Sequence, residues 1–384
     1  MSQAEKEAIS VLTAVIGKKY VLTDKKSVEF YSMDVYRSFE VPIAVVQPGS
    51  VEELQEVVRV ATGLGIAIVT RGGGASYTDG YLATTPKSIT IDTSRLNKIV
   101  EINEEDMLVT VEPGVTWAEM AAVLSEKNLR TPFWGPFSGL KATVGGSTSQ
   151  NSVSMGTSAY GGSPESVLCY DIVLPSGKIL KTGSSSMENS SAFFRHYGPD
   201  LTGLFSGDAG ALGVKARITL RLIKLPTHTL TCSFGFKDYG SMSEGMAAAA
   251  REQSVSSNWG LDPKLQQGQL GKVTLSDAIK AGFAVLKTAR NPFEAIVQLG
   301  KMALAGKRFL TGFDYSAHFV VEGYSVAEVK SKLAQTRKAV GPYGTETANT
   351  IPTVLGAMPF MPLYPILGPQ GERWVPMHGF LPFS

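Results

Sequence analysis

The stretch IAIVTRGGGASYTDG, residues 66–80, joins a short β-branched run to three consecutive glycines. The run before the glycines predicts a β-strand, and Gly65 ahead of it is typical of a residue that ends a helix. Consecutive glycines let backbone amides approach a ligand closely, and successive amides can form an anion-binding concavity, with Arg71 adding a positive charge beside it. The stretch therefore indicates a diphosphate site at the end of a strand, although three glycines alone are also typical of an ordinary tight turn.

Two common phosphate-binding patterns do not fit this loop. The pattern GxGxxG with a following helix and an acidic residue is missing, and so is the pattern GxxxxGK[ST]. The loop therefore belongs to another scheme of phosphate recognition.

The chain around the loop alternates strand and helix signals. Residues 41–45 are β-rich, and Ser50 is a typical N-cap for residues 51–65, whose apolar side chains recur at helical spacing. Residues 137–162 are rich in Gly, Ser, Thr and Asn, a composition that on its own is typical of linkers. Further strands are expected at residues 88–94, 98–102, 107–113 and 216–226, a helix at 116–127, and a hairpin at 171–180. These signals predict an α+β sheet packed with helices.

A second domain is expected after Pro226. Two β-rich runs each precede a helical pattern, at residues 230–236 before 241–253 and at residues 317–324 before 325–340. Residues 276–308 also favour a helix, which Pro292 would break in two. We expect one domain over residues 1–226 and another over residues 227–384.

Composition favours a small-molecule partner. The chain has 384 residues, enough for two domains, and its 36 basic and 34 acidic residues nearly cancel, which argues against nucleic acid or an anionic membrane surface. Cys169 and Cys232 have no CxxC or metal-ligand spacing, so neither a disulfide framework nor a zinc site is expected. The N-terminus lacks a signal-peptide pattern, and no stretch is apolar enough to span a bilayer. We expect a cytoplasmic protein, with peripheral membrane attachment through a partner left open.

Four separated motifs carry a resemblance to a known family. They are RGGGAS at residues 71–76, VEPGVTW at 111–117, the Gly- and Ser-rich stretch continuing to a hairpin at 142–180, and DLTGLFSGDAGALGVKARITLRL at 200–222. Together they resemble the FAD-binding domain of the vanillyl-alcohol oxidase superfamily, also called the PCMH-type FAD-binding superfamily. The last motif is most similar to the branch of glycolate oxidase FAD-subunits and D-lactate dehydrogenases. The resemblance covers residues 41–226 and is specific because four motifs agree in order and spacing.

The resemblance implies an α+β fold with a two-subdomain FAD-binding domain at residues 1–226, followed by an α+β cap domain for the substrate at residues 227–384. Members of the superfamily normally continue after the cap strands with a segment that returns to the FAD-binding domain, whereas this sequence stops at Ser384. We therefore expect a cap domain that lacks the usual C-terminal segment, in a truncated chain or in a subunit that a partner chain completes.

The resemblance also implies which residues hold FAD. The pyrophosphate would be wrapped by Arg71, Gly72, Gly73, Gly74, Ala75, Ser76 and Tyr77, with a turn at Pro113 and Gly114. The flavin and ribityl chain would be lined by Thr143, Gly145, Gly146, Ser149, Gln150 and Asn151, with the wall continued by Tyr160 and Gly161. Main chain at Gly210, Gly213 and Val214 would lie against the adenine side. Burying a large planar cofactor requires glycine for close approach and hydroxyls for orientation.

The histidines bear on attachment, metal binding and catalysis. Some relatives tether FAD through a histidine in the glycine loop, but this loop has Gly74, Ala75 and Ser76, so FAD is expected to be non-covalent there. His378 lies about where the glycolate branch carries a two-histidine metal motif, but the polar middle and the second histidine are missing, so no bound metal is predicted. His378 is a candidate base for a substrate hydroxyl because imidazole suits neutral pH, with an ordinary surface or core histidine as the alternative.

The resemblance implies an FAD-linked oxidase or dehydrogenase that oxidises a small hydroxylated substrate by hydride transfer to the flavin. In the glycolate branch the substrate would be a 2-hydroxy acid such as lactate or glycolate, and Lys307, Arg308 and Arg373 are candidates for binding its carboxylate. One alternative is a para-substituted phenol in an apolar pocket lined by residues 358–369. Another is a non-catalytic FAD-binding subunit that relays electrons. The electron acceptor, whether oxygen, a cytochrome or a quinone, stays open, as does assembly into a homo-oligomer.

Overall fold

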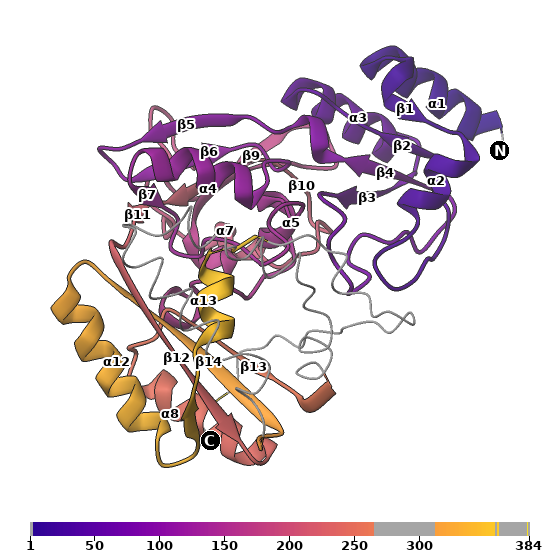
Figure 1. Ribbon diagram of the computed structural model, residues 1–384. Helices are drawn as coiled ribbons and strands as arrows, with labels where there is room; N and C mark the ends of the chain where they lie inside the picture. The colour runs from indigo at the N-terminus through magenta and orange to yellow at the C-terminus, as the bar shows by residue number, and fades with distance from the viewer. Residues whose placement is uncertain (1–2, 265–311, 358, 361–381, 383–384) are drawn as a thin grey trace. The chain divides into compact units, whose positions relative to one another are not determined.

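The computed structural model describes residues 3–264, 312–357, 359–360 and 382 (Figure 1). The chain divides into two compact units, one made of Met1–Val153 and Gly161–Lys224 and the other of Ser154–Tyr160 and Leu225–Ser384. Both units combine helices with β-sheets, so the predicted α+β class is confirmed. The division differs from the expected one in that Ser154–Tyr160 joins the second unit. The helix predicted at residues 276–308 lies outside the described residues.

The first unit contains a four-stranded sheet in the order β1-β2-β4-β3. Its strands are β1 (Val21–Leu22), β2 (Ala44–Val46), β3 (Ala67–Arg71) and β4 (Ser88–Asp92), with β2 and β3 parallel to β4 and β1 antiparallel to β2. Helix α3 (Val51–Gly63) follows β2 and begins after Ser50, whose side chain accepts a hydrogen bond from the Glu53 amide at 3.1 Å. The predicted order of strand, helix, strand and glycine loop is confirmed, with the loop leaving the end of β3.

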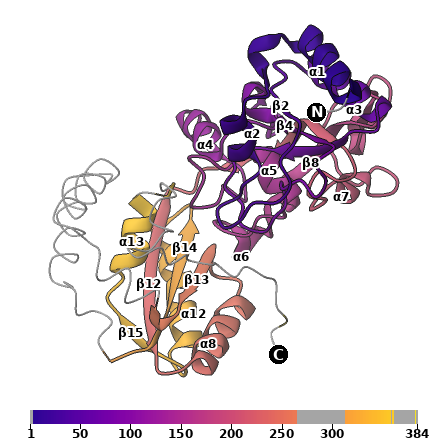
Figure 2. The ribbon, with the colours of Figure 1, turned by 90° about the vertical axis from the view of Figure 1, so that its right-hand side faces the viewer.

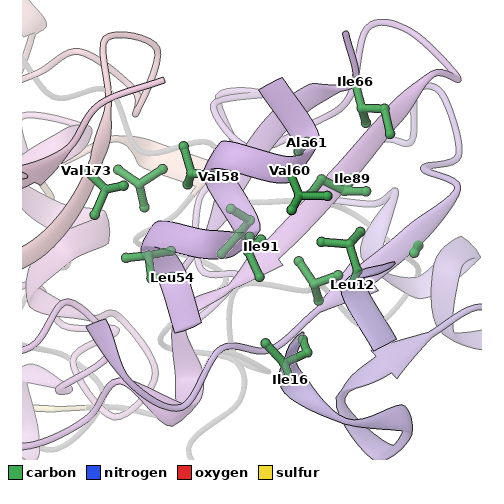
Figure 3. Close-up of a cluster of buried hydrophobic side chains, with 14 of the residues drawn as sticks. Leu12, Ile16, Leu54, Val58, Val60, Ala61, Ile66, Ile89, Ile91 and Val173 are labelled. Carbon is green, nitrogen blue, oxygen red and sulfur yellow. The ribbon is translucent and has the colours of Figure 1, made fainter. Parts of the chain in front are cut away.

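One apolar core supports this sheet. Leu12 of α1 (Gln3–Ile16), Leu54 of α3 and Ile91 of β4 are fully buried members of a single cluster (Figure 3). Val173, which lies in the other sheet of this unit, belongs to the same cluster. Burying a side chain of this size stabilises the folded state by about 1.5–3 kcal/mol. The shared core therefore fixes the two sheets of the first unit against each other.

That other sheet has five antiparallel strands in the order β5-β6-β10-β8-β9. The strands are β5 (Ile99–Asn103), β6 (Leu108–Val111), β8 (Val167–Val173), β9 (Ile179–Lys181) and β10 (Val214–Arg221). Strands β8 and β9 form the predicted hairpin, in which Gly177 takes a φ of 78°. Helix α4 (Trp117–Glu126) follows β6, and its start is fixed by a reciprocal capping box between Thr116 and Glu119.

Shorter elements complete the first unit. They are η1 (Lys18–Tyr20), α2 (Lys25–Tyr31), η2 (Thr93–Arg95), β7 (Leu129–Arg130), α5 (Val144–Ser149), η3 (Ser163–Ser166), η4 (Gly183–Ser186), α7 (Leu201–Leu204) and β11 (Ile223–Lys224). Helix α5 lies in the stretch whose composition is typical of linkers. The Trp117 indole donates to the Ser147 hydroxyl at 2.8 Å, and both side chains are buried. A buried contact from α4 thus helps to hold a segment whose composition alone does not indicate a helix.

The second unit is built on a four-stranded antiparallel sheet in the order β13-β14-β12-β15. The strands are β12 (His228–Phe236), β13 (Ser257–Leu261), β14 (Tyr315–Gly323) and β15 (Thr345–Thr347). Helices α8 (Tyr239–Arg251) and α12 (Val326–Val340) pack on each other and on β12 and β14 (Figures 1 and 2). Both predicted pairs of strand and helix are therefore present. Two short helices are also described, α6 (Thr157–Tyr160) and α13 (Thr350–Ala357). None of the described helices is long and apolar enough to cross a membrane.

Side chains alternate across this second sheet. Phe234 and Phe319 pack in the apolar cluster with the helices, with ring centroids 6.2 Å apart. His318 is the neighbour of Phe319 in the strand and therefore points to the other face. Its Nδ1 lies 2.9 Å from Ser233 Oγ and its Nε2 lies 3.2 Å from Ser316 Oγ. Complete burial disfavours the charged ring and lowers the pKa of His318 to about 3.

Replacing His318 with glutamine should flatten the pH dependence of the second unit's stability. Between the ordinary pKa of 6.5 and about 3, the unfolded chain binds a proton at His318 that the native protein does not. The free energy of unfolding of the wild type should therefore fall by about 1.4 kcal/mol for each pH unit as the pH decreases through this window. Glutamine can still hydrogen-bond to the two serines but cannot bind this proton. Urea unfolding across the window measures the two slopes.

The matched control for this prediction is His228→Gln. His228 lies on the same sheet but is only partly buried, so its replacement should leave the slope close to that of the wild type. Equal slopes for the wild type and His318→Gln would contradict the prediction, because they would mean that the buried ring is protonated in the folded protein.

Candidate FAD-binding site

The glycine loop lies against the segment that precedes α5. A Cβ atom on Gly72 would lie 2.3 Å from Thr143 Oγ1, and one on Gly73 would lie 1.6 Å from the carbonyl oxygen of Lys141. Contacts this close leave no room for a side chain at either position. The loop therefore needs glycine in order to pack on its own chain, and this packing brings the first and third sequence motifs together.

The backbone amides of this loop are available to a ligand. Within the part of the chain that the structure describes, no N–H group of residues 72–77 donates a hydrogen bond to another residue. Most of these residues are half-buried and none is fully buried, so a ligand can reach the loop. Successive amides of this kind form a concavity suited to an anion such as a diphosphate.

The predicted turn at Pro113 and Gly114 joins the same region. The Gly145 amide donates to the Pro113 carbonyl at 2.9 Å, and a Cβ atom on Gly145 would lie 2.6 Å from Pro113 Cβ. The Gly114 amide donates to the Leu96 carbonyl at 2.8 Å, and a Cβ atom there would lie 2.1 Å from the Thr93 carbonyl oxygen. Main-chain contacts thus connect the second motif to the third, with glycine required on both sides.

The end of α5 contacts the fourth motif. The Ser149 carbonyl accepts a hydrogen bond from the Ala209 amide at 2.8 Å. Gly210 takes a φ of 77°, and a Cβ atom on it would lie 2.3 Å from Thr70 Oγ1, next to the start of the glycine loop. The fourth motif therefore bridges the end of α5 and the end of β3.

Polar side chains close the other end of the loop. The Thr78 hydroxyl donates to Gln150 Oε1 at 3.0 Å and lies 3.0 Å from Ser76 Oγ. The Tyr77 ring lies 5.9 Å from the Tyr36 ring. Burial raises the pKa of Tyr77 to about 12, so its hydroxyl is protonated and can donate at neutral pH. Thr78 thus connects Ser76 of the glycine loop to Gln150, the residue that follows α5.

The remaining predicted positions lie as follows. Val214 belongs to the apolar core, and a Cβ atom on Gly213 would lie 2.5 Å from Ile172 Cγ2. Tyr160 belongs to the second unit, whereas Gly161, with a φ of 82°, belongs to the first. The other predicted members of the site, Gly74, Ala75, Gly146 and Asn151, lie within the loop or in and just after α5. The candidates His378, Lys307, Arg308 and Arg373 lie outside the described residues.

The guanidinium of Arg71 lies among aromatic rings. Its central carbon is 4.7 Å from the ring centroid of Tyr31, 4.9 Å from that of Tyr81 and 5.2 Å from that of Phe30. Its Nη1 atom also donates long hydrogen bonds of 3.4 and 3.3 Å to the carbonyls of Phe30 and Met33. Phe30, Tyr31 and Met33 come from α2 and the residues just after it, a segment that the motifs do not include, whereas Tyr81 follows the glycine loop.

The structure also shows a buried ion pair that the sequence analysis missed. Lys215 Nζ lies 2.7 Å from Asp208 Oδ1, and the two side chains are only 3% and 2% exposed. The same oxygen accepts a hydrogen bond from the Gly210 amide at 3.0 Å. Burial lowers the pKa of Lys215, and the Asp208 carboxylate offsets part of that effect. The sequence did carry a signal for this ion pair. Lys215 occupies an otherwise apolar position of β10, and Asp208 lies in the glycine-rich turn just before that strand.

Comparison with known proteins agrees with this geometry. Residues 42–183 match a family described as FAD binding domain. A mitochondrial D-lactate dehydrogenase (cytochrome) of Arabidopsis thaliana is 31% identical over 237 residues, which are 60% of this chain and 40% of that protein. The glycolate oxidase subunit GlcD of Bacillus subtilis is 29% identical over 197 residues, 51% of this chain and 40% of that protein. The crystal structure of p-cresol methylhydroxylase with substrate bound has a TM-score of 0.72 at 21% identity, covering 94% of this chain and 70% of that one.

The chain is therefore an FAD-binding protein, because the matched region contains the glycine loop, the turn at Pro113 and Gly114, and α5. Its likeness in fold to p-cresol methylhydroxylase agrees with the resemblance to the PCMH-type superfamily that the four motifs carry. The predicted fold class and the predicted cofactor are both confirmed. The chain covers less than half the length of the two sequence relatives, and its likeness to the solved structure concerns the fold.

Proposed function

We propose that the chain is an FAD-linked oxidoreductase that oxidises a small 2-hydroxy acid such as lactate or glycolate. The observation that carries the proposal is the row of available amides at residues 72–77, held against the third motif by glycines that admit no side chain. The names of the two sequence relatives, D-lactate dehydrogenase and glycolate oxidase subunit, support the substrate class. Bound FAD supplies the hydride acceptor for such an oxidation.

The described residues contribute binding and orientation. The amides of residues 72–77 hold the pyrophosphate, and the hydroxyls of Ser76 and Tyr77 are donors beside it. Small residues of α5 and the turn at Pro113 and Gly114 let the main chain approach the cofactor closely. The base that takes the proton of the substrate hydroxyl is proposed to be His378, and the cations for the substrate carboxylate are proposed to be Lys307, Arg308 or Arg373.

A para-substituted phenol is the second candidate substrate, favoured by the likeness in fold to p-cresol methylhydroxylase. A non-catalytic FAD-binding subunit that relays electrons within a larger assembly is the alternative from another class. Each predicts a different response of the flavin to added substrate, so one experiment separates all three.

The experiment uses the purified full chain. We expect a yellow protein that releases FAD on denaturation and whose flavin absorption bleaches when D-lactate or glycolate is added without oxygen. Bleaching by a 4-alkylphenol alone would support the phenol instead. A yellow protein that none of these compounds bleaches would favour the electron-relay subunit. A colourless protein with no FAD in the denatured extract would contradict the enzyme and the relay subunit alike.

A further inference from the structure

Residues 30–37, at the end of α2 and just beyond it, contact the glycine loop at both of its ends. At the start of the loop, Phe30 and Tyr31 place their rings on the guanidinium of Arg71. At the far end, the Asp79 amide donates to Asp34 Oδ2 at 3.2 Å. This segment precedes the region that matches the FAD binding domain family, which begins at residue 42.

Asp34 organises the segment as well as the loop. Its Oδ1 atom accepts hydrogen bonds from the amides of Tyr36 at 2.6 Å and Arg37 at 2.8 Å. These bonds hold Arg37 where its Nε lies 3.1 Å from Asp79 Oδ1. The Asp34 carboxylate therefore links a tight turn in residues 30–37 directly to the end of the glycine loop.

Tyr31 anchors the segment to the sheet. Its hydroxyl donates to Asp92 Oδ2 at 2.6 Å, and Gln47 Nε2 donates to the same oxygen at 2.8 Å. Asp92 ends β4, the strand that pairs with β3, and Figure 1 shows α2 beside these strands. Residues 30–37, which contact the glycine loop, are therefore themselves fixed to the first sheet.

The Arg71 side chain packs against the backbone of the glycine loop. Arg71 is only 8% exposed, and three aromatic rings surround its guanidinium. A Cβ atom on Gly74 would lie 2.5 Å from Arg71 Nη2, so the backbone of the loop rests on this group. A planar guanidinium can stack on rings while its edge meets carbonyls, which a lysine ammonium cannot reproduce.

We propose that residues 30–37 and Arg71 form a clamp that holds the glycine loop in the conformation that accepts the pyrophosphate of FAD. Arg71 acts in this clamp as a positioning residue, and the loop amides are the groups that contact the pyrophosphate. The direction of those amides depends on the backbone of residues 72–77, which the clamp fixes at both ends. The inference rests on FAD as the cofactor of this site.

The test compares FAD binding by deflavinated full chain in the wild type, Arg71→Lys and Arg71→Met, followed by flavin fluorescence. We expect both variants to bind FAD about tenfold more weakly, to a similar extent, because each loses the stacked guanidinium. The salt dependence of the dissociation constant should stay that of the wild type in both, since no direct ion pair with the pyrophosphate is removed. If Arg71 contacted the pyrophosphate directly, the opposite pattern is expected. Arg71→Lys would then keep the affinity for FAD, and Arg71→Met would weaken both the affinity and its salt dependence.

A second variant tests the far end of the clamp without touching Arg71. Asp34→Ala should weaken FAD binding by about tenfold as well, and should speed hydrogen exchange of the amides at residues 72–80. Asp238→Ala is the matched control. The Asp238 carboxylate also accepts a hydrogen bond from a backbone amide, that of Ser241 at the start of α8, but it lies in the second unit. This variant should leave both measurements unchanged.

The outcomes separate the clamp from the cofactor assignment. A wild-type chain that binds no FAD overturns the assignment of the cofactor itself. A wild type that binds FAD, with Arg71→Lys equal to it and Arg71→Met much weaker, overturns the clamp and makes Arg71 a direct ligand. Unchanged affinity and exchange in Asp34→Ala also overturn the clamp. Thermal unfolding of each apoprotein establishes that it is folded, and Asp34→Ala carries the test should the Arg71 variants not fold.

Discussion

Replacing Gly73 with alanine is expected to leave the protein without tightly bound FAD. The alanine Cβ would lie 1.6 Å from the carbonyl oxygen of Lys141 and 2.5 Å from its carbonyl carbon. Both are main-chain atoms, so they cannot rotate away as the end of a flexible side chain could. The clash is relieved only when the glycine loop and residues 141–143 separate. That movement turns the amides of residues 72–77 away from the pyrophosphate.

We expect the affinity for FAD to fall by about a hundredfold or more, equivalent to roughly 3 kcal/mol. The ratio of FAD to chain after desalting, read from the absorption spectrum, measures the effect. Gly63→Ala is the matched control, because Gly63 is the last residue of α3 and a Cβ atom on it would meet nothing within 4 Å. A Gly73→Ala protein that keeps its full complement of FAD would show that this loop does not hold the pyrophosphate in the conformation described.

The elements that could be predicted from the sequence are those with local signals. The β-branched run before the glycines and the N-cap at Ser50 act within a few residues, and they predicted β3 and α3 correctly. Helix α5 could not be predicted in this way, because its residues are mostly Gly, Ser and Thr. It is held in place by a contact with Trp117, a residue of α4 that donates to Ser147 from 30 positions earlier in the chain. Contacts of this kind become visible only when the fold is known.

The same distinction applies to the site. The glycines of the loop were predicted as groups that admit a ligand closely, and the geometry shows that Gly72 and Gly73 are required by packing on residues 141–143. Two of the rings around Arg71 come from residues about 40 positions away along the chain, as the separation of 41 between Arg71 and Phe30 shows, and the third is that of Tyr81. The sequence therefore predicted a role for Arg71 in the site without indicating which groups the side chain contacts.

Replacing Lys215 with methionine is expected to destabilise the first unit strongly. The change keeps an apolar stem that ends one atom short of the lysine nitrogen but leaves the Asp208 carboxylate buried without its cation. The other carboxylate oxygen, Oδ2, is already buried without a hydrogen-bond partner among the described residues, so it cannot compensate. Removing one member of a buried ion pair typically costs about 3–5 kcal/mol. For a unit of this size the melting temperature should fall by on the order of 10 °C.

The double variant Lys215→Met with Asp208→Asn distinguishes loss of a charge partner from loss of packing. It removes both charges while keeping both shapes, and it should recover most of the stability that Lys215→Met loses. Lys127→Met is the matched control, since Lys127 pairs with Glu104 at an exposed position and should change stability by no more than about 1 kcal/mol. Thermal unfolding of the apoproteins gives all of these values. If the double variant were as unstable as Lys215→Met, the stability would depend on contacts of the lysine other than its ion pair with Asp208, such as that of its ammonium with the Tyr170 ring, whose centroid lies 5.3 Å from Nζ.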